Sequence, residues 1–197
     1  MPADADADEG LMLAYAAGHA GAFDTLYARH RGPVFRYLVR HCGDARLAEE
    51  LFQDVWTNVI RVRASYAPTA KFTTWLYTLA HNRLVDHWRA RGQAGFVSID
   101  DDEGGGAHRE AALSLPGSRT DEPEVRAAAQ EVGRRIAAAL AALPAVQRDA
   151  FLLQQEAGLS LAQIAELMGA GEETVKSRLR YASAKLRAAL DDLREAR

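Results

Sequence analysis

The chain has 197 residues, a formal net charge of −3 and an apolar fraction of 48%. This length suffices for one medium domain or two small ones, and this apolar fraction is normal for a globular protein. Disorder throughout the chain is therefore excluded. Alanine and leucine are frequent whereas valine and isoleucine are scarce, which favours helices over sheets.

The single cysteine, Cys42, excludes an intramolecular disulfide and suits a reducing compartment. The acidic stretch 1–10 lacks the apolar core of a signal peptide, and we expect it to be a flexible N-terminus. No run of about eighteen apolar residues occurs that could span a membrane. These observations predict a cytoplasmic protein without direct membrane insertion.

The first block, residues 11–91, has apolar residues at helical spacing. We expect Gly32–Pro33 to break or bend its second helix and Asp44 to cap the third. The predicted helices of this block are 11–17, 22–41, 45–62 and 71–91.

Residues 92–122 contain three consecutive glycines, a Pro–Gly pair and the acidic run Asp100–Glu103, with little periodicity. This composition is typical of a flexible linker. Helical periodicity resumes in a second block, residues 123–197. Its predicted helices are 123–142, 144–157, 160–168 and 172–194. The predicted fold class is therefore all-α, with two small helical domains joined by a linker.

A short helix, a glycine-containing turn and a longer basic helix at 160–194 form a helix-turn-helix pattern. Ser160 and Gln163 have the spacing of a capping box at the start of the short helix. The alternative interpretation is an ordinary helical hairpin with a solvated basic face. Under the first interpretation, the DNA-facing residues are Thr174, Lys176, Ser177, Arg178, Arg180, Tyr181 and Lys185.

Four segments carry a resemblance to one protein family. Gly171–Ala182 resembles the end of sigma factors of the extracytoplasmic function (ECF) group, although some response regulators share a similar run. Ala48–Trp56 resembles the polymerase-binding helix of that group, and Phe72–Arg89 resembles its promoter-melting helix. Leu143–Arg148 resembles the start of its C-terminal domain. The chain thus resembles ECF members of the sigma-70 family over most of its length.

The resemblance implies sigma region 2 at 11–91 and sigma region 4 at 123–197. It also implies a transcription initiation factor that is not an enzyme, because the polymerase performs nucleotidyl transfer. The implied partners are the β′ clamp and β flap of core RNA polymerase, promoter DNA and an anti-sigma factor. No cofactor is expected.

Glu50, Gln53 and Asp54 fall at i, i+3 and i+4 and therefore share one helix face, here called the polar stripe. By itself this pattern fits an ordinary solvated face. The resemblance assigns it to core polymerase binding, with Trp56 adding an apolar contact.

For the −10 promoter element, the resemblance assigns the loop Ser65–Lys71 to a flipped base. Aromatic and cationic residues interleave from there along the next helix, as in proteins that hold single strands. Phe72 and Trp75 have the spacing of core residues. The residues expected to contact −10 DNA are Lys71, Asn82, Arg83, Arg89 and Arg91.

The two alternatives to a sigma factor are a nucleic-acid enzyme and a helix-turn-helix regulator. The six histidines and Cys42 show no metal-ligand spacing, and no phosphate loop or catalytic triad stands out, which disfavours a nucleic-acid enzyme and a metal site. A helix-turn-helix regulator of response-regulator type remains the alternative. Such a regulator needs a sensor domain, for which the first block offers no phosphoacceptor pattern.

Overall fold

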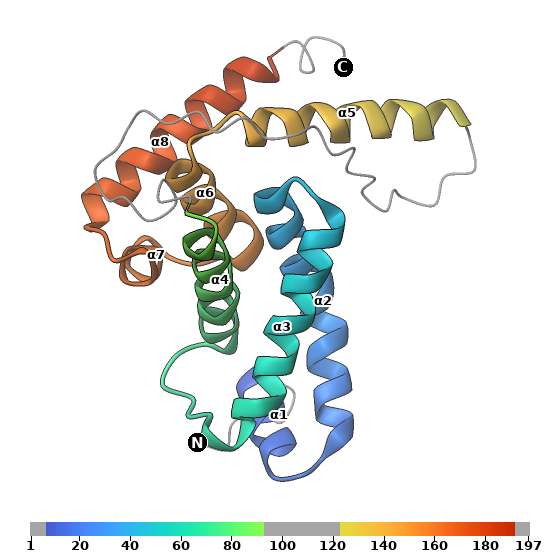
Figure 1. Cartoon of the computed structure of the whole chain (residues 1–197), viewed down its shortest axis with the longest axis vertical. Helices are drawn as coiled ribbons and strands as arrows, with labels where there is room; N and C mark the ends of the chain where they lie inside the picture. The colour runs from blue at the N-terminus through green and yellow to red at the C-terminus, as the bar shows by residue number, and fades with distance from the viewer. Residues whose placement is uncertain (1–6, 93–122, 192–197) are drawn as a thin grey trace.

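The computed structural model describes residues 7–92 and 123–191, which are all helical or connecting segments without a strand. The all-α prediction is confirmed for this part of the chain (Figure 1). The linker expected at 92–122 lies, apart from Gly92, outside the described residues. The elements are α1 (Asp8–Ala16), α2 (Ala20–Cys42), α3 (Ala45–Val62), the 3-10 turn η1 (Arg63–Ser65), α4 (Phe72–Ala90), α5 (Pro123–Ala141), α6 (Ala145–Ala157), α7 (Leu161–Met168) and α8 (Glu172–Ala189).

Helix α1 begins at Asp8, so the last residues of the expected flexible segment 1–10 are in fact helical. Their side chains have partners elsewhere in the fold. Asp8 forms an ion pair with Arg29 at 2.9 Å and lies 2.7 Å from His30 Nε2. Acidic residues also suit the first turn of a helix because its free amides carry partial positive charge. These contacts fix α1 against α2.

A break or a bend was expected at Gly32–Pro33; helix α2 runs through Pro33 without ending there, so the break is wrong. Proline removes one backbone hydrogen bond, which normally disfavours a helix interior. Here Leu26 lies fully buried before the proline, and Val34 and Leu38 lie fully buried after it. Apolar burial on both sides offsets the lost bond, because packing contributes most of the stability of helices in proteins.

Two side-chain caps expected from the sequence are present. The carboxylate of Asp44 accepts hydrogen bonds from the backbone amides of Arg46 and Leu47 at the start of α3. The Ser160 hydroxyl accepts from the Gln163 amide, while the Gln163 side chain accepts from the Ser160 amide at 2.9 Å. This capping box fixes the start of α7, and Gly169, with φ of 61°, ends the helix in the left-handed conformation.

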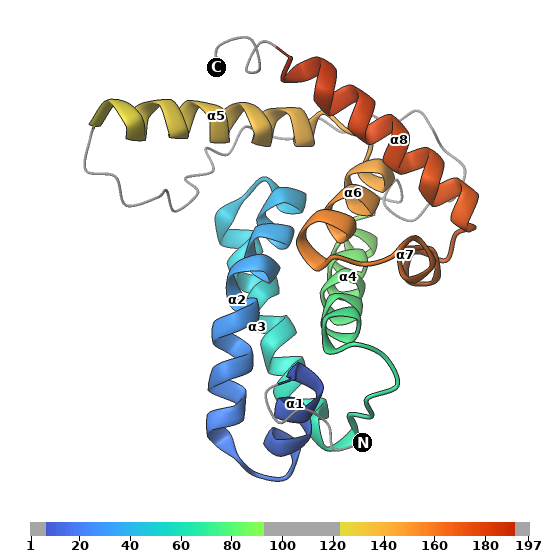
Figure 2. The same ribbon diagram turned by 180° about the vertical axis from the view of Figure 1, so that it is seen from behind.

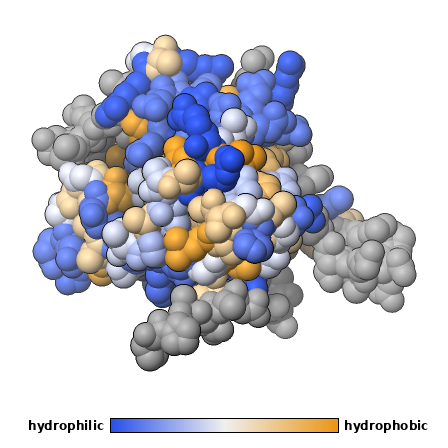
Figure 3. Space-filling view, turned by 90° about the horizontal axis from the view of Figure 1, so that it is seen from below, coloured by the Kyte–Doolittle hydropathy of each residue, from blue (hydrophilic) through white to orange (hydrophobic). Residues whose placement is uncertain are grey.

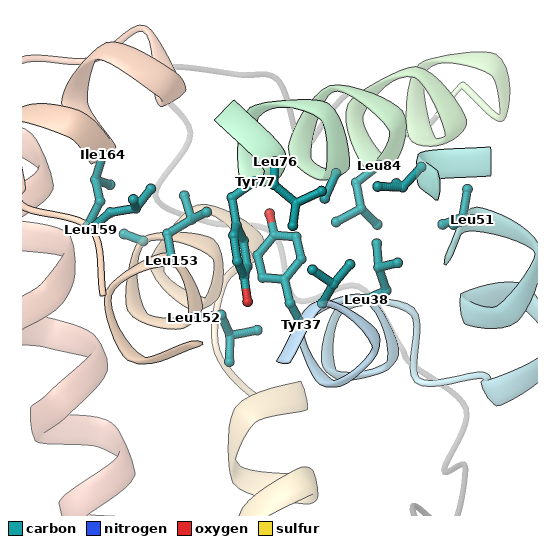
Figure 4. Close-up of a cluster of buried hydrophobic side chains, with 14 of the residues drawn as sticks. Tyr37, Leu38, Leu51, Leu76, Tyr77, Leu84, Leu152, Leu153, Leu159 and Ile164 are labelled. Atoms are coloured by element: carbon teal, nitrogen blue, oxygen red, sulfur yellow. The ribbon is translucent and has the colours of Figure 1, made fainter. Parts of the chain in front are cut away.

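The N-terminal half (α1–α4) and the C-terminal half (α5–α8) contact each other directly. Helix α6 lies beside α2 and α4 in both orientations of the molecule (Figure 2). Fully buried side chains continue from one half into the other, with Tyr37 and Tyr77 facing Leu152 and Leu153 (Figure 4). The described residues therefore share one continuous hydrophobic core. They include no helix with the length and apolarity needed to cross a membrane.

Replacing Ser160 with alanine should lower the free energy of unfolding by about 1 kcal/mol, because it removes half of the capping box. Ser183→Ala on the exposed side of α8 is the matched control and should change stability by less than about 0.5 kcal/mol. Denaturant unfolding of both variants measures the difference. Equal losses in the two variants would contradict a capping role for Ser160.

Candidate polymerase and nucleic-acid interfaces

The polar stripe lies on the solvent side of α3. Glu50, Gln53 and Asp54 are exposed, while Leu51 and Val55 of the same helix are buried. The amphipathic pattern of the helix thus presents the three side chains together, as their spacing predicted. This face is free to receive a partner in the structure.

Trp56 does not belong to that exposed face. Its side chain is only 5% exposed and packs among aromatic rings, with centroids 4.9 Å from Tyr27 and 5.8 Å from Phe23. Two residues beyond Asp54, the helix has turned by about 200°, which points Trp56 toward α2. The expectation that Trp56 contacts the polymerase is corrected accordingly: it supports α3 from the inside.

Asp54 also touches the residue set expected for the −10 element. Its carboxylate accepts hydrogen bonds from Arg83 Nε at 2.8 Å and Arg83 Nη2 at 2.7 Å. Both residues line a groove of about 420 Å³ between α3 and α4, together with Asn58, Asn82 and Asp86. The sequence did not show that the two predicted sites share this groove.

The remaining residues expected at the −10 element are exposed on the loop before α4 and along that helix. Lys71 and Asn82 reach solvent, as do Arg89 and Arg91 near its end. Phe72 is fully buried, which confirms the prediction that it belongs to the core. Trp75 is partly buried and packs at the edge of the same core.

The start of α4 is held by a residue that the sequence did not indicate. Lys71 provides no side-chain cap, and the Phe72 amide instead donates a 2.5 Å hydrogen bond to the Glu9 carboxylate of α1. Nearby, burial and then the charges of Glu9 and Asp8 raise the pKa of Tyr66 to about 12. Because 63 residues separate Glu9 from Phe72, no local pattern could reveal this contact.

Seen from below the view of Figure 1, the molecule shows apolar side chains in small patches among polar ones (Figure 3). Large apolar side chains exposed in the N-terminal half are Leu13 and Ile60. Small, separated patches of this kind are normal on a protein surface. They give no indication of an extensive apolar docking face at this end.

Helix α8 presents most of the side chains expected at the −35 element. Thr174, Lys176, Arg180, Tyr181 and Lys185 are exposed, and Ser177 is partly exposed. The guanidinium of Arg180 lies 5.2 Å from the centre of the Tyr181 ring, a cation–π contact that orients both groups.

Arg178 departs from this exposed set, since it is 9% exposed and shares the inner stripe of α8 with Val175 and Ala182. Its position three residues after Val175 and four before Ala182 places it on the core-facing side. The expectation that Arg178 reads bases is corrected: in this structure it lies mainly within the C-terminal half.

Between the halves lies a buried polar group, here called the interdomain cluster, that consists of Tyr37, His41, His81 and Asp149. The Tyr37 hydroxyl donates to Asp149 Oδ1 at 2.8 Å. His41 Nε2 lies 3.2 Å from Asp149 Oδ1, and His81 Nδ1 lies 3.0 Å from Asp149 Oδ2. No local sequence pattern reveals this cluster, because its members come from three helices.

Burial alone would raise the pKa of Asp149, but the adjacent His81 and His41 outweigh it and hold that pKa well below the ordinary range. The carboxylate is therefore ionised. Burial and then Asp149 raise the pKa of the Tyr37 phenol well above its ordinary value, which keeps it a hydrogen-bond donor. In the part of the chain that the structure describes, no group of three or more His, Cys, Asp or Glu residues is arranged to hold a metal.

Two family models match this chain, one in each half. Residues 26–94 match Sigma-70 region 2, and residues 133–186 match Sigma-70, region 4. The ECF RNA polymerase sigma factor SigL of Mycobacterium tuberculosis (strain ATCC 25618 / H37Rv) is 34% identical over 179 residues, which cover 90% of this chain and 94% of the relative. This chain belongs to the ECF sigma factor family.

A second relative of this sigma factor is the ECF RNA polymerase sigma factor SigK of Mycolicibacterium vanbaalenii, which is 32% identical over 92% of this chain and 88% of its own. Two solved structures share the fold. CnrH in complex with the cytosolic domain of CnrY has a TM-score of 0.65 at 23% identity and covers 95% of this chain and 99% of its own. RpoE of Bartonella quintana, in complex with the anti-sigma factor NepR, has a TM-score of 0.65 at 22% identity and covers 86% and 96%.

Trp56→Ala should lower the free energy of unfolding of the sigma factor by about 3–5 kcal/mol, because it leaves a cavity among packed aromatic rings. Ile60→Ala, on the exposed side of the same helix, should cost less than about 0.5 kcal/mol. Chemical denaturation compares the two. A nearly neutral Trp56→Ala that binds polymerase poorly would instead favour a direct contact.

Acidification should destabilise the folded protein through His41. Burial is the largest influence on this group and lowers its pKa below the ordinary value of 6.5, although Asp149 partly opposes the shift. The unfolded chain then binds a proton more readily, so this stability contribution is present above about pH 6.5 and is lost below it.

Unfolding measured from pH 7.5 to 5.5 should show a weaker pH dependence in His41→Gln than in wild type. The exposed His19→Gln should retain the wild-type dependence, and an unchanged slope in His41→Gln would contradict this assignment.

Proposed function

We propose that this chain is an alternative sigma factor that binds core RNA polymerase and directs it to promoters with −10 and −35 elements. The observation that carries the proposal is the match of region 2 to the half with the polar stripe and of region 4 to the half with the helix-turn-helix. The factor acts without catalysis of its own, since the polymerase forms the phosphodiester bond. Its place of action is the cytoplasm, where polymerase and promoter are.

We assign region 2 to residues 11–91 and region 4 to residues 123–197, as the sequence suggested, with α1 beginning slightly earlier. The polar stripe on α3 is the proposed contact to the β′ clamp, and the C-terminal half is the proposed contact to the β flap. Exposed carboxylates steer association with a basic partner surface. Glu50 and Asp54 provide two such groups on one face.

Two surfaces of the chain take the DNA. Lys71, Asn82, Arg83, Arg89 and Arg91 would hold the separated strand and a flipped base at the −10 element, where exposed cations neutralise phosphates. The exposed side of α8 would enter the major groove at the −35 element. Its proposed contacts are Thr174, Lys176, Ser177, Arg180, Tyr181 and Lys185.

An anti-sigma factor is the proposed regulator. Support comes from two proteins of the same fold, one solved with the cytosolic domain of CnrY and the other with the anti-sigma factor NepR. Their identities of 23% and 22% carry the fold, so this regulation is an extension by analogy.

The proposal is tested with purified chain, core polymerase and a library of promoter fragments. Specific run-off transcripts should appear only when chain and core are both present. A sequence-specific DNA shift without core, and no transcript with core, would overturn the proposal in favour of a helix-turn-helix regulator.

Charge reversal in the polar stripe should weaken core binding selectively. Glu50→Lys should raise the dissociation constant for core about tenfold, because it replaces an attractive charge with a repulsive one. Glu49→Lys carries the same charge change on an adjacent exposed position outside the stripe and should bind nearly as wild type. Fluorescence titration against core measures both. Equal effects of the two substitutions would show that only net charge matters.

Arg180→Ala should weaken binding to −35 duplexes by about 1–3 kcal/mol and by an amount that depends on base sequence. Lys185→Ala, also exposed on α8, should lose affinity evenly across sequences, as expected for a phosphate contact. Binding of holoenzyme to a set of −35 variants separates the two patterns. A uniform loss for Arg180→Ala would assign it to phosphate as well.

A further inference from the structure

The loop proposed to accept an unstacked base, residues 65–71, is attached to α1 at both ends. At its start, the guanidinium of Arg63 in η1 lies 5.7 Å from the centre of the Tyr15 ring of α1. At its end, the Phe72 amide donates to the Glu9 carboxylate of α1. Helix α1 lies at the same end of the molecule as this loop in both views (Figures 1 and 2). One helix therefore fixes where the loop leaves η1 and where it enters α4.

Between these two points the loop is largely exposed to solvent. Residues 67–71 are all exposed. Tyr66 is buried instead, with its ring centroid 5.0 Å from that of Trp75 and 6.3 Å from that of Phe72. The shape of the exposed part therefore depends on how firmly its two ends are held.

The start of α4 needs a cap that its own sequence does not provide. Lys71 occupies the N-cap position, makes no side-chain cap hydrogen bond and brings a cation to the positive end of the helix. The first turn contains no acidic residue. The Glu9 carboxylate supplies the missing acceptor, 2.5 Å from the Phe72 nitrogen, together with a favourable charge. The N-cap position is thereby left to a lysine that is proposed to contact DNA.

The residue before Glu9 attaches α1 to the neighbouring helix. Asp8 pairs with Arg29 of α2 at 2.9 Å and lies 2.7 Å from His30 Nε2 of the same helix. The His30 ring in turn lies 5.2 Å from the Phe72 ring, measured between centroids. Adjacent acids of α1 thus engage α2 and α4, so the Glu9 carboxylate is presented to α4 from a helix that is itself fixed.

We propose that Glu9 is a positioning residue for the −10 element: by capping α4, it holds the loop 65–71 in the shape that receives an unstacked base. The inference rests on the proposed function and extends it to a residue that acts without contacting DNA. Taking a base out of the stack costs free energy. A loop that is already ordered adds no further ordering cost, so more of the binding free energy remains to hold the base.

A positioning role has a signature that a general loss of stability lacks. If Glu9 acts through the loop, its removal should weaken binding only when the DNA carries a base that the loop can receive. If Glu9 merely stabilised the fold, its removal should weaken binding to every DNA equally. An abasic site at the extruded position separates the two cases.

The first test uses holoenzyme and a promoter fragment whose −10 element is already single-stranded. 2-Aminopurine, placed at each −10 position of the non-template strand in turn, identifies the extruded base by its rise in fluorescence. The natural base at that position is then compared with an abasic site. Glu9→Ala should raise the Kd for the natural DNA about tenfold and change the Kd for the abasic DNA by less than about twofold.

Two further variants separate the hydrogen bond from the charge. Glu9→Gln keeps a side-chain oxygen that can accept the Phe72 amide hydrogen, and it should bind the natural DNA within about twofold of wild type. Asp24→Ala removes an exposed carboxylate of α2 and, as the control, should match wild type. Equal losses of Glu9→Ala on natural and abasic DNA, or a Glu9→Gln variant as weak as Glu9→Ala, would overturn the positioning role.

Hydrogen exchange of the chain without polymerase or DNA tests the contact independently of the proposed function. The Phe72 amide should exchange about tenfold faster in Glu9→Ala, while the amides of α6 keep their wild-type rates and Glu9→Gln keeps slow exchange at Phe72. Unchanged exchange at Phe72 in Glu9→Ala would overturn the positioning role. Absence of DNA binding and transcripts with wild-type holoenzyme would overturn the proposed function, and with it the −10 role, while faster exchange in Glu9→Ala would still establish the cap.

Discussion

The ionised carboxylate of Asp149 is the constraint on which the relation between the two halves depends. An isolated charge inside a protein is so unfavourable that its surroundings must supply donors. Here the Tyr37 hydroxyl of α2 donates to Asp149, and the imidazoles of His41 on α2 and His81 on α4 lie 3.2 Å and 3.0 Å from it. All three neighbours of the carboxylate thus belong to the N-terminal half. The hydrophobic core continues through Tyr37, Tyr77 and Leu152 and adds buried apolar area to this contact. The Asp149 charge determines how the two halves align.

The surfaces proposed for partners lie away from this contact. The polar stripe occupies the outer face of α3, and the basic side of α8 points to solvent. The pair between Asp54 and Arg83 joins the proposed polymerase site to the proposed −10 site within one groove. Since both groups are substantially exposed, this pair contributes little to stability and its partners remain available for exchange.

How far the sequence predicts this protein depends on how local each feature is. The helices, the Asp44 cap, the Ser160–Gln163 capping box and the polar stripe follow from short-range spacing, and each is present. Residue type and resemblance place Trp56 and Arg178 at binding surfaces, yet both are buried. Their burial depends on which side of its helix each residue occupies and on the helix packed against that side. Pro33 stays helical because tertiary packing outweighs its propensity.

The features that escaped prediction altogether join distant parts of the chain. Tyr37 and Asp149 are 112 residues apart, and Glu9 and Phe72 are 63 residues apart. Neither pair therefore produces a short-range spacing pattern in the sequence. Buried polar contacts of this kind are specified by the fold as a whole. They become visible only when helices from different parts of the sequence have been placed side by side.

The Glu9 contact connects the amino-terminal helix to the loop that is proposed to act in promoter opening. The Glu9 carboxylate on α1 caps the first turn of α4, because Lys71 supplies no side-chain cap. The start of α4 is therefore stabilised by a helix that holds none of the proposed DNA contacts. Proteolytic loss of α1, or a bulky fusion that displaces it, would leave every proposed nucleic-acid ligand in the chain. It would nevertheless loosen the loop that is proposed to accept an unstacked base.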